Sequence, residues 1–220
     1  ADGVFKTVEN SYIYVERELE AGKIRRGLLG LIDLEAYDYR ADSVSPVHAT
    51  EGTVESRLPP RVKIREGATL ELPHIVVFVD DPENKVFANL GEGEKLYDFD
   101  LMDAGGHITG TRVSGFDAER VQNELNKLAD SDYLESRYAL GGKSPVIIAM
   151  GDGNHSLATA RLCWERIREG LSSEERKNHP ARFGLAELVN IHDASIDFEP
   201  IHRVLFETDT REFYGETENY

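Results

Sequence analysis

The sequence has little cysteine, no long apolar run and few basic residues. With one cysteine among 220 residues, no disulfide can form within the chain, so nothing demands an oxidising compartment. No apolar run approaches the roughly 20 residues that cross a bilayer, and no signal peptide is visible. We therefore expect a cytoplasmic location and no membrane partner.

The charge balance is strongly acidic. Lysine and arginine together number 25 against 41 aspartates and glutamates, which gives a formal net charge of −16. A nucleic-acid binder needs a basic face to neutralise phosphates, so we expect no nucleic-acid partner. The hydrophobic content of 40% and apolar runs such as Ile75-Val76-Val77-Phe78-Val79 are typical of a packed globular core.

Strand and helix patterns interleave irregularly along the chain. Alternation and apolar runs predict strands over 11–18, 24–34, 73–80, 96–102, 106–113, 145–150, 182–191 and 198–206. Helical signals cover 52–58, 59–67, 116–130 with Asp117 as N-cap, 156–170 with Gly170 as C-cap, and a short helix opened by the Ser172/Glu175 capping box.

The expected fold class is α+β (mixed α/β), a mixed sheet with flanking helices. We expect one domain over 1–220, with a subdomain division near 82–95 as the alternative. Because the chain begins at Ala1 without a methionine and ends in the polar stretch 212–220, we expect it to be a fragment of a longer protein.

The sharpest chemical signal is Gly151-Asp152-Gly153-Asn154-His155-Ser156, which follows a buried strand and opens an amphipathic helix. Two glycines permit a sharp turn, and the first helical turn presents unpaired N–H groups that favour an anion. Gly151 and Gly153 to Ser156 are therefore the predicted phosphate-binding residues. Asp152 and His155 are the predicted catalytic pair, because a carboxylate and an imidazole can move protons.

The alternative is a Gly-rich turn with an Asp or Asn N-cap and no ligand. The segment is neither a Walker A loop nor a Rossmann fingerprint, since it lacks GKS/GKT and GxGxxG.

The segment from Met150 to Ala160 resembles the signature of the uncharacterised bacterial and archaeal family called domain of unknown function 1015. The resemblance covers nearly the whole chain, in order. Further matching segments are Gly27–Glu35, Arg57–Arg61, Gly105–Ile108 and Pro200–Val204.

The same turn is similar, more distantly, to the phosphate-binding turn of ParB/sulfiredoxin-like domains. Those include nucleotide-dependent kinases of free serine, in which the turn holds nucleotide phosphates and a carboxylate is the base. The resemblance thus implies a nucleotide with Mg²⁺ as cofactor. This sequence departs from the pattern, with Asn154 in place of the first His and Ser156 in place of Arg, which removes a bidentate phosphate clamp.

Replacement clamps lie elsewhere in the chain. Arg57, Arg61 and Arg65 recur at spacing four and form one basic stripe if they are helical. That stripe either faces an anionic ligand or pairs with acidic side chains. His107, in a Gly-rich turn, and His202 are further candidate ligand-binding residues because they could meet His155, and Arg203 is a further candidate clamp.

Metal sites need three or four converging ligands, and the chain has neither HExxH nor close His/Cys spacing, so we assign no metal ligand. Mg²⁺ accompanying a nucleotide would need a carboxylate such as Asp152 or Asp33. We interpret Cys163 as an inert buried thiol, His74 as structural, and His179 and His192 as solvated.

Three functions remain open. The favoured one is a phosphate- or nucleotide-binding small-molecule enzyme of phosphoryl-transfer type. The second is a non-catalytic sensor of a nucleotide or anionic metabolite. The third is a metal-dependent hydrolase using His107, Asp152, His155 and His202.

Overall fold

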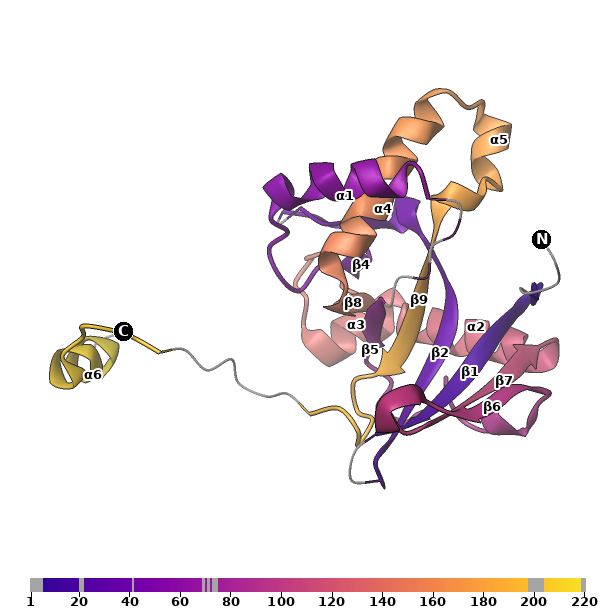
Figure 1. The fold of residues 1–220 in the computed structure, drawn as a ribbon, viewed down its shortest axis with the longest axis horizontal. Helices are drawn as coiled ribbons and strands as arrows, with labels where there is room; N and C mark the ends of the chain where they lie inside the picture. Colours follow the sequence, from indigo (N-terminus) through magenta and orange to yellow (C-terminus); the bar gives the residue numbers. More distant parts are fainter. Residues whose placement is uncertain are drawn as a thin grey trace.

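A single mixed sheet organises the protein (Figure 1). The computed structural model describes residues 6–19, 22–40, 42–68, 70, 72, 75–197 and 204–218. Over these residues the sheet has 9 strands in the order β3-β4-β8-β5-β9-β2-β1-β7-β6. Parallel pairs (β3–β4, β4–β8 and β5–β9) occur beside antiparallel ones, so the predicted α+β class is confirmed.

The strands are β1 (Ser11–Glu18), β2 (Ile24–Asp33), β3 (Tyr37–Asp38), β4 (Val47–His48), β5 (Val76–Val79), β6 (Lys95–Asp100), β7 (His107–Ser114), β8 (Ile148–Asp152) and β9 (Phe183–Asn190). The helices are α1 (Leu58–Arg65), α2 (Phe116–Leu128), α3 (Ser131–Tyr138), α4 (Asn154–Glu169), α5 (Ser173–Lys177) and α6 (Thr210–Glu218). Short 3-10 turns cover Leu34–Ala36, Glu55–Arg57, Leu90–Glu92, Met102–Ala104 and Pro180–Arg182.

The core lies between the sheet and the helices α2 and α4. Val121 of α2 and Leu157 of α4 are both fully buried and belong to one apolar cluster with Leu28, Val77 and Leu188 of the sheet. Residues 82–95, where the sequence allowed a subdomain division, contribute buried side chains to this same cluster.

Glycines allow close packing in the middle of the sheet. A Cβ on Gly27 of β2 would lie 2.2 Å from Oε1 of Glu187 on β9, the neighbouring strand. Glycine at this position therefore leaves the space that the Glu187 side chain occupies.

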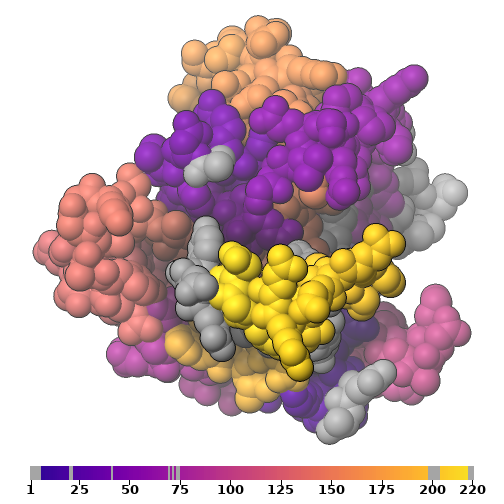
Figure 2. All heavy atoms as spheres, turned by 90° about the vertical axis from the view of Figure 1, so that its left-hand side faces the viewer, coloured from indigo at the N-terminus to yellow at the C-terminus, as the bar shows by residue number. Residues whose placement is uncertain are grey.

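Helix α6 stands apart from the sheet in Figure 1. Figure 2, viewed from the side on which α6 lies, shows α1 and the segment before it above this helix, with α3 to one side. No helix within the described ranges has the length and apolar character needed to cross a membrane.

Most predicted elements are confirmed, including the β6–β7 pair, the strands β1, β2 and β9, and the capping box of α5. The predicted N-cap Asp117 is wrong: α2 begins after Gly115, whose positive φ of 55° provides the turn, and Asp117 lies inside the first helical turn. Helix α3 and the two-residue strands β3 and β4 were not predicted. Of the predicted strand 198–206, residues 198–203 lie outside the described residues, and 204–206 are not in a strand.

Candidate functional site

The Gly151–Ser156 turn is tighter than its sequence suggested. Gly151 and Asp152 are the last two residues of β8, not part of a loop, and α4 begins at Asn154. One residue, Gly153, makes the whole connection with φ 87°, a left-handed conformation that favours glycine. The strand therefore delivers the chain directly to the first turn of a 16-residue helix.

The first turn of α4 exposes fewer N–H donors than we expected. Gly153 N–H already donates to Oδ1 of Asp152 at 2.7 Å, so it is not available to a ligand. The first helical hydrogen bond runs from Leu157 N–H to the Gly153 carbonyl at 3.0 Å. The N–H groups of Asn154, His155 and Ser156 precede that bond and remain the donors of this turn.

Asn154 is the most buried polar residue of the turn. The residue is only 9% exposed to solvent. Its side-chain Oδ1 has no hydrogen-bond partner among the described residues. A buried acceptor without a partner costs about 1–3 kcal/mol. A hydroxyl or ammonium donor on a ligand would remove that cost.

His155 is held by a segment that precedes α1. Its Nε2 accepts a hydrogen bond from Val54 N–H at 3.3 Å. An accepting Nε2 leaves the proton of the neutral imidazole on Nδ1. His155 is therefore oriented as a donor through Nδ1, and accepting a proton on Nε2 would break its contact with Val54.

The Asp152 carboxylate keeps some unused hydrogen-bonding capacity. It is exposed, and only its Oδ1 is engaged, by Gly153 N–H. Its Oδ2 bonds to no residue in the described part of the chain, so this oxygen is accessible to a substrate proton or to a cation.

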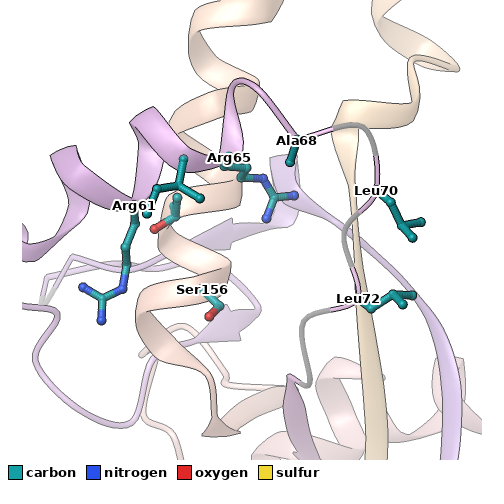
Figure 3. Close-up of a pocket in the computed structure, with 8 residues that line it drawn as sticks. Arg61, Arg65, Ala68, Leu70, Leu72 and Ser156 are labelled. Atoms are coloured by element: carbon teal, nitrogen blue, oxygen red, sulfur yellow. The ribbon is translucent and has the colours of Figure 1, made fainter.

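Helix α1 packs against α4 and forms a cleft beside the turn (Figure 3). Leu58 and Val62 of α1 are buried, and Pro59 and Pro60 lie in the first helical turn, where a missing N–H costs no helical hydrogen bond. At the far end of α1, Glu66 accepts from Arg166 of α4 at 2.5 Å. These contacts fix the register of the two helices.

The cleft has a volume of about 330 Å³ and combines polar and apolar walls. Its lining residues are Arg61, Ile64, Arg65, Ala68, Leu70, Leu72, Ser156 and Thr159. Figure 3 shows Arg61 and Arg65 on α1 and Ser156 on the first turn of α4. The arginine stripe and the turn, 95 residues apart between Arg61 and Ser156, thus contribute to one cavity.

Arg61, Ser156 and Thr159 each keep some unused hydrogen-bonding capacity in the cleft. One nitrogen of Arg61 donates to the Arg57 carbonyl at 2.9 Å, and its other donors engage no residue that the structure describes. The Ser156 hydroxyl forms no hydrogen bond within the described ranges. The Thr159 hydroxyl donates to the His155 carbonyl at 2.6 Å and can still accept. Arg57 itself contributes its carbonyl and does not line the cleft.

The structure does not bring His107 to this site. His107 begins β7, which β5, β9, β2 and β1 separate from β8, a distance of about 24 Å at normal strand spacing. Its two ring nitrogens contact Asp100 and Asp98, each at 2.7 Å, and these carboxylates raise the pKa of His107.

Asp33 does not fit a magnesium site. Its carboxylate accepts from Arg182 through both oxygens and from Glu35 N–H. Burial would raise the pKa of Asp33, but these hydrogen bonds outweigh it and the pKa is lowered. No group of three or more His, Cys, Asp or Glu side chains suited to a metal is found among the residues described.

His202, Arg203 and His74 lie outside the described residues. Of the other residues interpreted as structural or solvated, Cys163 is buried and free of disulfide, and His192 contacts Asp80 at 2.6 Å.

Sequence reasoning missed five of the eight residues that line the cleft. The sequence could have indicated Thr159, because it lies three residues after Ser156 on the same face of the predicted helix. Ile64, Leu70 and Leu72 carry no motif, and nothing in their spacing indicates that they face α4. Their place depends on how α1 crosses α4.

The fold and this cleft define an α+β protein with a small cationic site at the junction of two helices. The chain belongs to the family described as Protein of unknown function (DUF1015), whose model matches residues 1–220. Comparison with curated proteins and with solved structures gave no match. The expected family is thus confirmed, whereas the likeness to ParB/sulfiredoxin-like domains rests on the turn alone.

Proposed function

We propose that the protein is a phosphate-binding small-molecule enzyme of phosphoryl-transfer type, with its site between α1 and the first turn of α4. One observation carries this proposal: Arg61 and Ser156, which come from distant parts of the sequence, line the same cleft at a helix N-terminus. A fixed cation, a hydroxyl donor and a helix dipole all favour a phosphoryl group there.

Each residue has a distinct role in this proposal. Arg61 replaces the arginine that the turn lacks at Ser156, and Ser156 donates its hydroxyl to a phosphoryl oxygen. Asp152 accepts the proton of the attacking hydroxyl through Oδ2, the hydroxyl oxygen bonds to the phosphorus, and the donor nucleotide leaves with one phosphate fewer. Positioning and charge stabilisation account for most of the rate in phosphoryl transfer, so this small set is sufficient.

A magnesium–nucleotide would be held through the same turn. Asp33 does not fit as its carboxylate ligand because Arg182 engages both of its oxygens. Oδ2 of Asp152 would hold the ion only in the sensor alternative, in which this oxygen is not used as a base. When bound, Mg²⁺ neutralises phosphate charge as it builds up.

Phosphate binding is tested by calorimetry with inorganic phosphate, pyrophosphate and nucleotides, each with and without Mg²⁺. We expect Arg61→Met to weaken binding about 10- to 100-fold, the value of a charge-assisted hydrogen bond of about 1.5–3 kcal/mol. The matched control is Lys63→Met, which removes the same charge from an exposed residue of α1 that does not line the cleft. Equal losses of affinity in both variants would mean that Arg61 acts only through the overall charge of the protein. If no phosphate compound binds, the proposal is overturned.

Catalysis is tested separately with Asp152→Asn, assayed for product from hydroxyl acceptors. We expect turnover to fall at least 100-fold while phosphate affinity changes little, since a general base contributes about 10²–10⁴ in rate. An unchanged rate removes Asp152 from the base role. Nucleotide binding without transfer to any hydroxyl would favour the sensor instead.

A further inference from the structure

We propose that the ligand of the α1–α4 cleft is a small amphiphilic anion with an aliphatic body. Its charged group would lie on Arg61 and Ser156. Its aliphatic part would lie on Ile64, Leu70 and Leu72. This inference rests on the proposed function, because the phosphate site supplies its polar end.

The apolar wall of the cleft is unusually open to water. Ile64 is 76% exposed, Leu70 51% and Leu72 71%, and all three line the same cavity. Figure 3 shows Leu70 and Leu72 on the opposite side of the cavity from Arg61. Arg61 and the two leucines are therefore separated across the cleft, while Ile64 lies one helical turn from Arg61 on α1. A ligand that carries a polar and an apolar group, at opposite ends, satisfies both walls and removes apolar surface from water.

The size of the cleft limits the ligand. Its volume of about 330 Å³ equals that of about eleven water molecules and lies at the low end for ligand sites. A compact ligand with one anionic group and a short chain fills it. A nucleotide would place only its phosphates here.

The test is an affinity series of n-alkyl monophosphates from methyl to hexyl, measured by calorimetry on the whole chain. Each buried methylene contributes up to about 0.8 kcal/mol, so we expect affinity to rise about two- to fourfold per carbon until the cleft is full. The gain in affinity per added carbon measures binding to the apolar wall of the cleft. The affinity for methyl phosphate measures binding to Arg61 and Ser156.

Two variants assign that slope to the cleft. Leu72→Ser and Ile64→Ser change exposed side chains, so we expect both proteins to fold and both slopes to flatten toward onefold per carbon. The matched control is Leu31→Ser, at a 66% exposed leucine of β2 that does not line this cleft, and its slope should stay unchanged.

Each outcome decides between the two proposals. Binding of methyl phosphate with no dependence on chain length overturns the amphiphile and leaves the phosphate site intact. A slope that survives both cleft variants also overturns it. Failure of every phosphate to bind overturns the proposed function itself.

A lipid headgroup would present the same chemistry as a free alkyl phosphate. Sedimentation with vesicles containing phosphatidate separates the two sources. We expect no binding, because a net charge of −16 opposes an anionic bilayer. Cosedimentation that Arg61→Met abolishes would overturn the assignment to a small free ligand.

Discussion

At the scale of single residues, Gly153 decides the geometry of the site. Its φ of 87° lets β8 pass into α4 with no intervening loop. Any residue with a Cβ pays about 1–2 kcal/mol to adopt this left-handed conformation. Gly151 is constrained for another reason, since a Cβ there would lie 2.5 Å from the Phe78 ring.

We expect Gly153→Ala to lower the free energy of unfolding by about 1–2 kcal/mol because of that strain. Urea denaturation measures the change. The matched control is Gly170→Ala at the other end of α4, where φ is −85° and the nearest contact of a Cβ would be 3.8 Å. This control should be neutral or slightly stabilising, and equal losses at both positions would contradict the role of the positive φ.

At the scale of elements, a single carboxylate ties α3 to the sheet. Asp80, directly after β5, accepts from Arg137 at 2.7 and 2.9 Å, from the Tyr138 hydroxyl, and from His192 at 2.6 Å. Burial would raise the pKa of Asp80, but these hydrogen bonds outweigh it and hold the pKa well below its usual range. Helix α3 has one buried residue, Leu134, so this polar cluster matters for its attachment.

A lowered folded pKa means that the charge of Asp80 stabilises the fold above the unfolded pKa of about 3.9 and that this contribution is lost as the pH falls below it. We expect Asp80→Asn to cost about 1–3 kcal/mol at pH 7 and progressively less below pH 4, measured by denaturation across pH. Asp42→Asn, at an exposed carboxylate, is the control and should change little at either pH. A deficit in Asp80→Asn that is the same at pH 3 and pH 7 would count against the ionic attachment.

At the scale of the whole molecule, net charge opposes compaction. A formal charge of −16 makes the folded chain repel itself, and salt screens that repulsion over about 8–10 Å. Salt also weakens the ion pairs, but most of them are exposed and such pairs contribute about 0–1 kcal/mol. Self-repulsion therefore dominates.

We expect raising NaCl from low concentration to 0.3 M to increase Tm by about 2–4 °C, equivalent to about 1 kcal/mol for a domain of this size. Thermal unfolding followed by circular dichroism gives the answer, with a non-phosphate buffer so that the cleft stays empty of added phosphate. A Tm that falls with salt would mean that the ion pairs outweigh the net charge.

The sequence by itself determined the elements with strong periodicity and the identity of the turn. Strands β1, β2 and β9 and helix α4 follow from apolar patterns that few alternatives satisfy, and Gly153 indicates a positive φ. The family also follows from the sequence, because the family model matches residues 1–220. These features are local, so neighbouring residues are enough to specify them.

Only the tertiary structure decided what surrounds the turn. The crossing of α1 over α4 brings Arg61 to Ser156, and the strand order keeps His107 away from both. The Asp152 carboxylate accepts a hydrogen bond from Gly153 N–H, so this N–H is not available to a ligand as we expected. Such contacts join residues far apart in the chain, and their energies depend on packing geometry that no local pattern records.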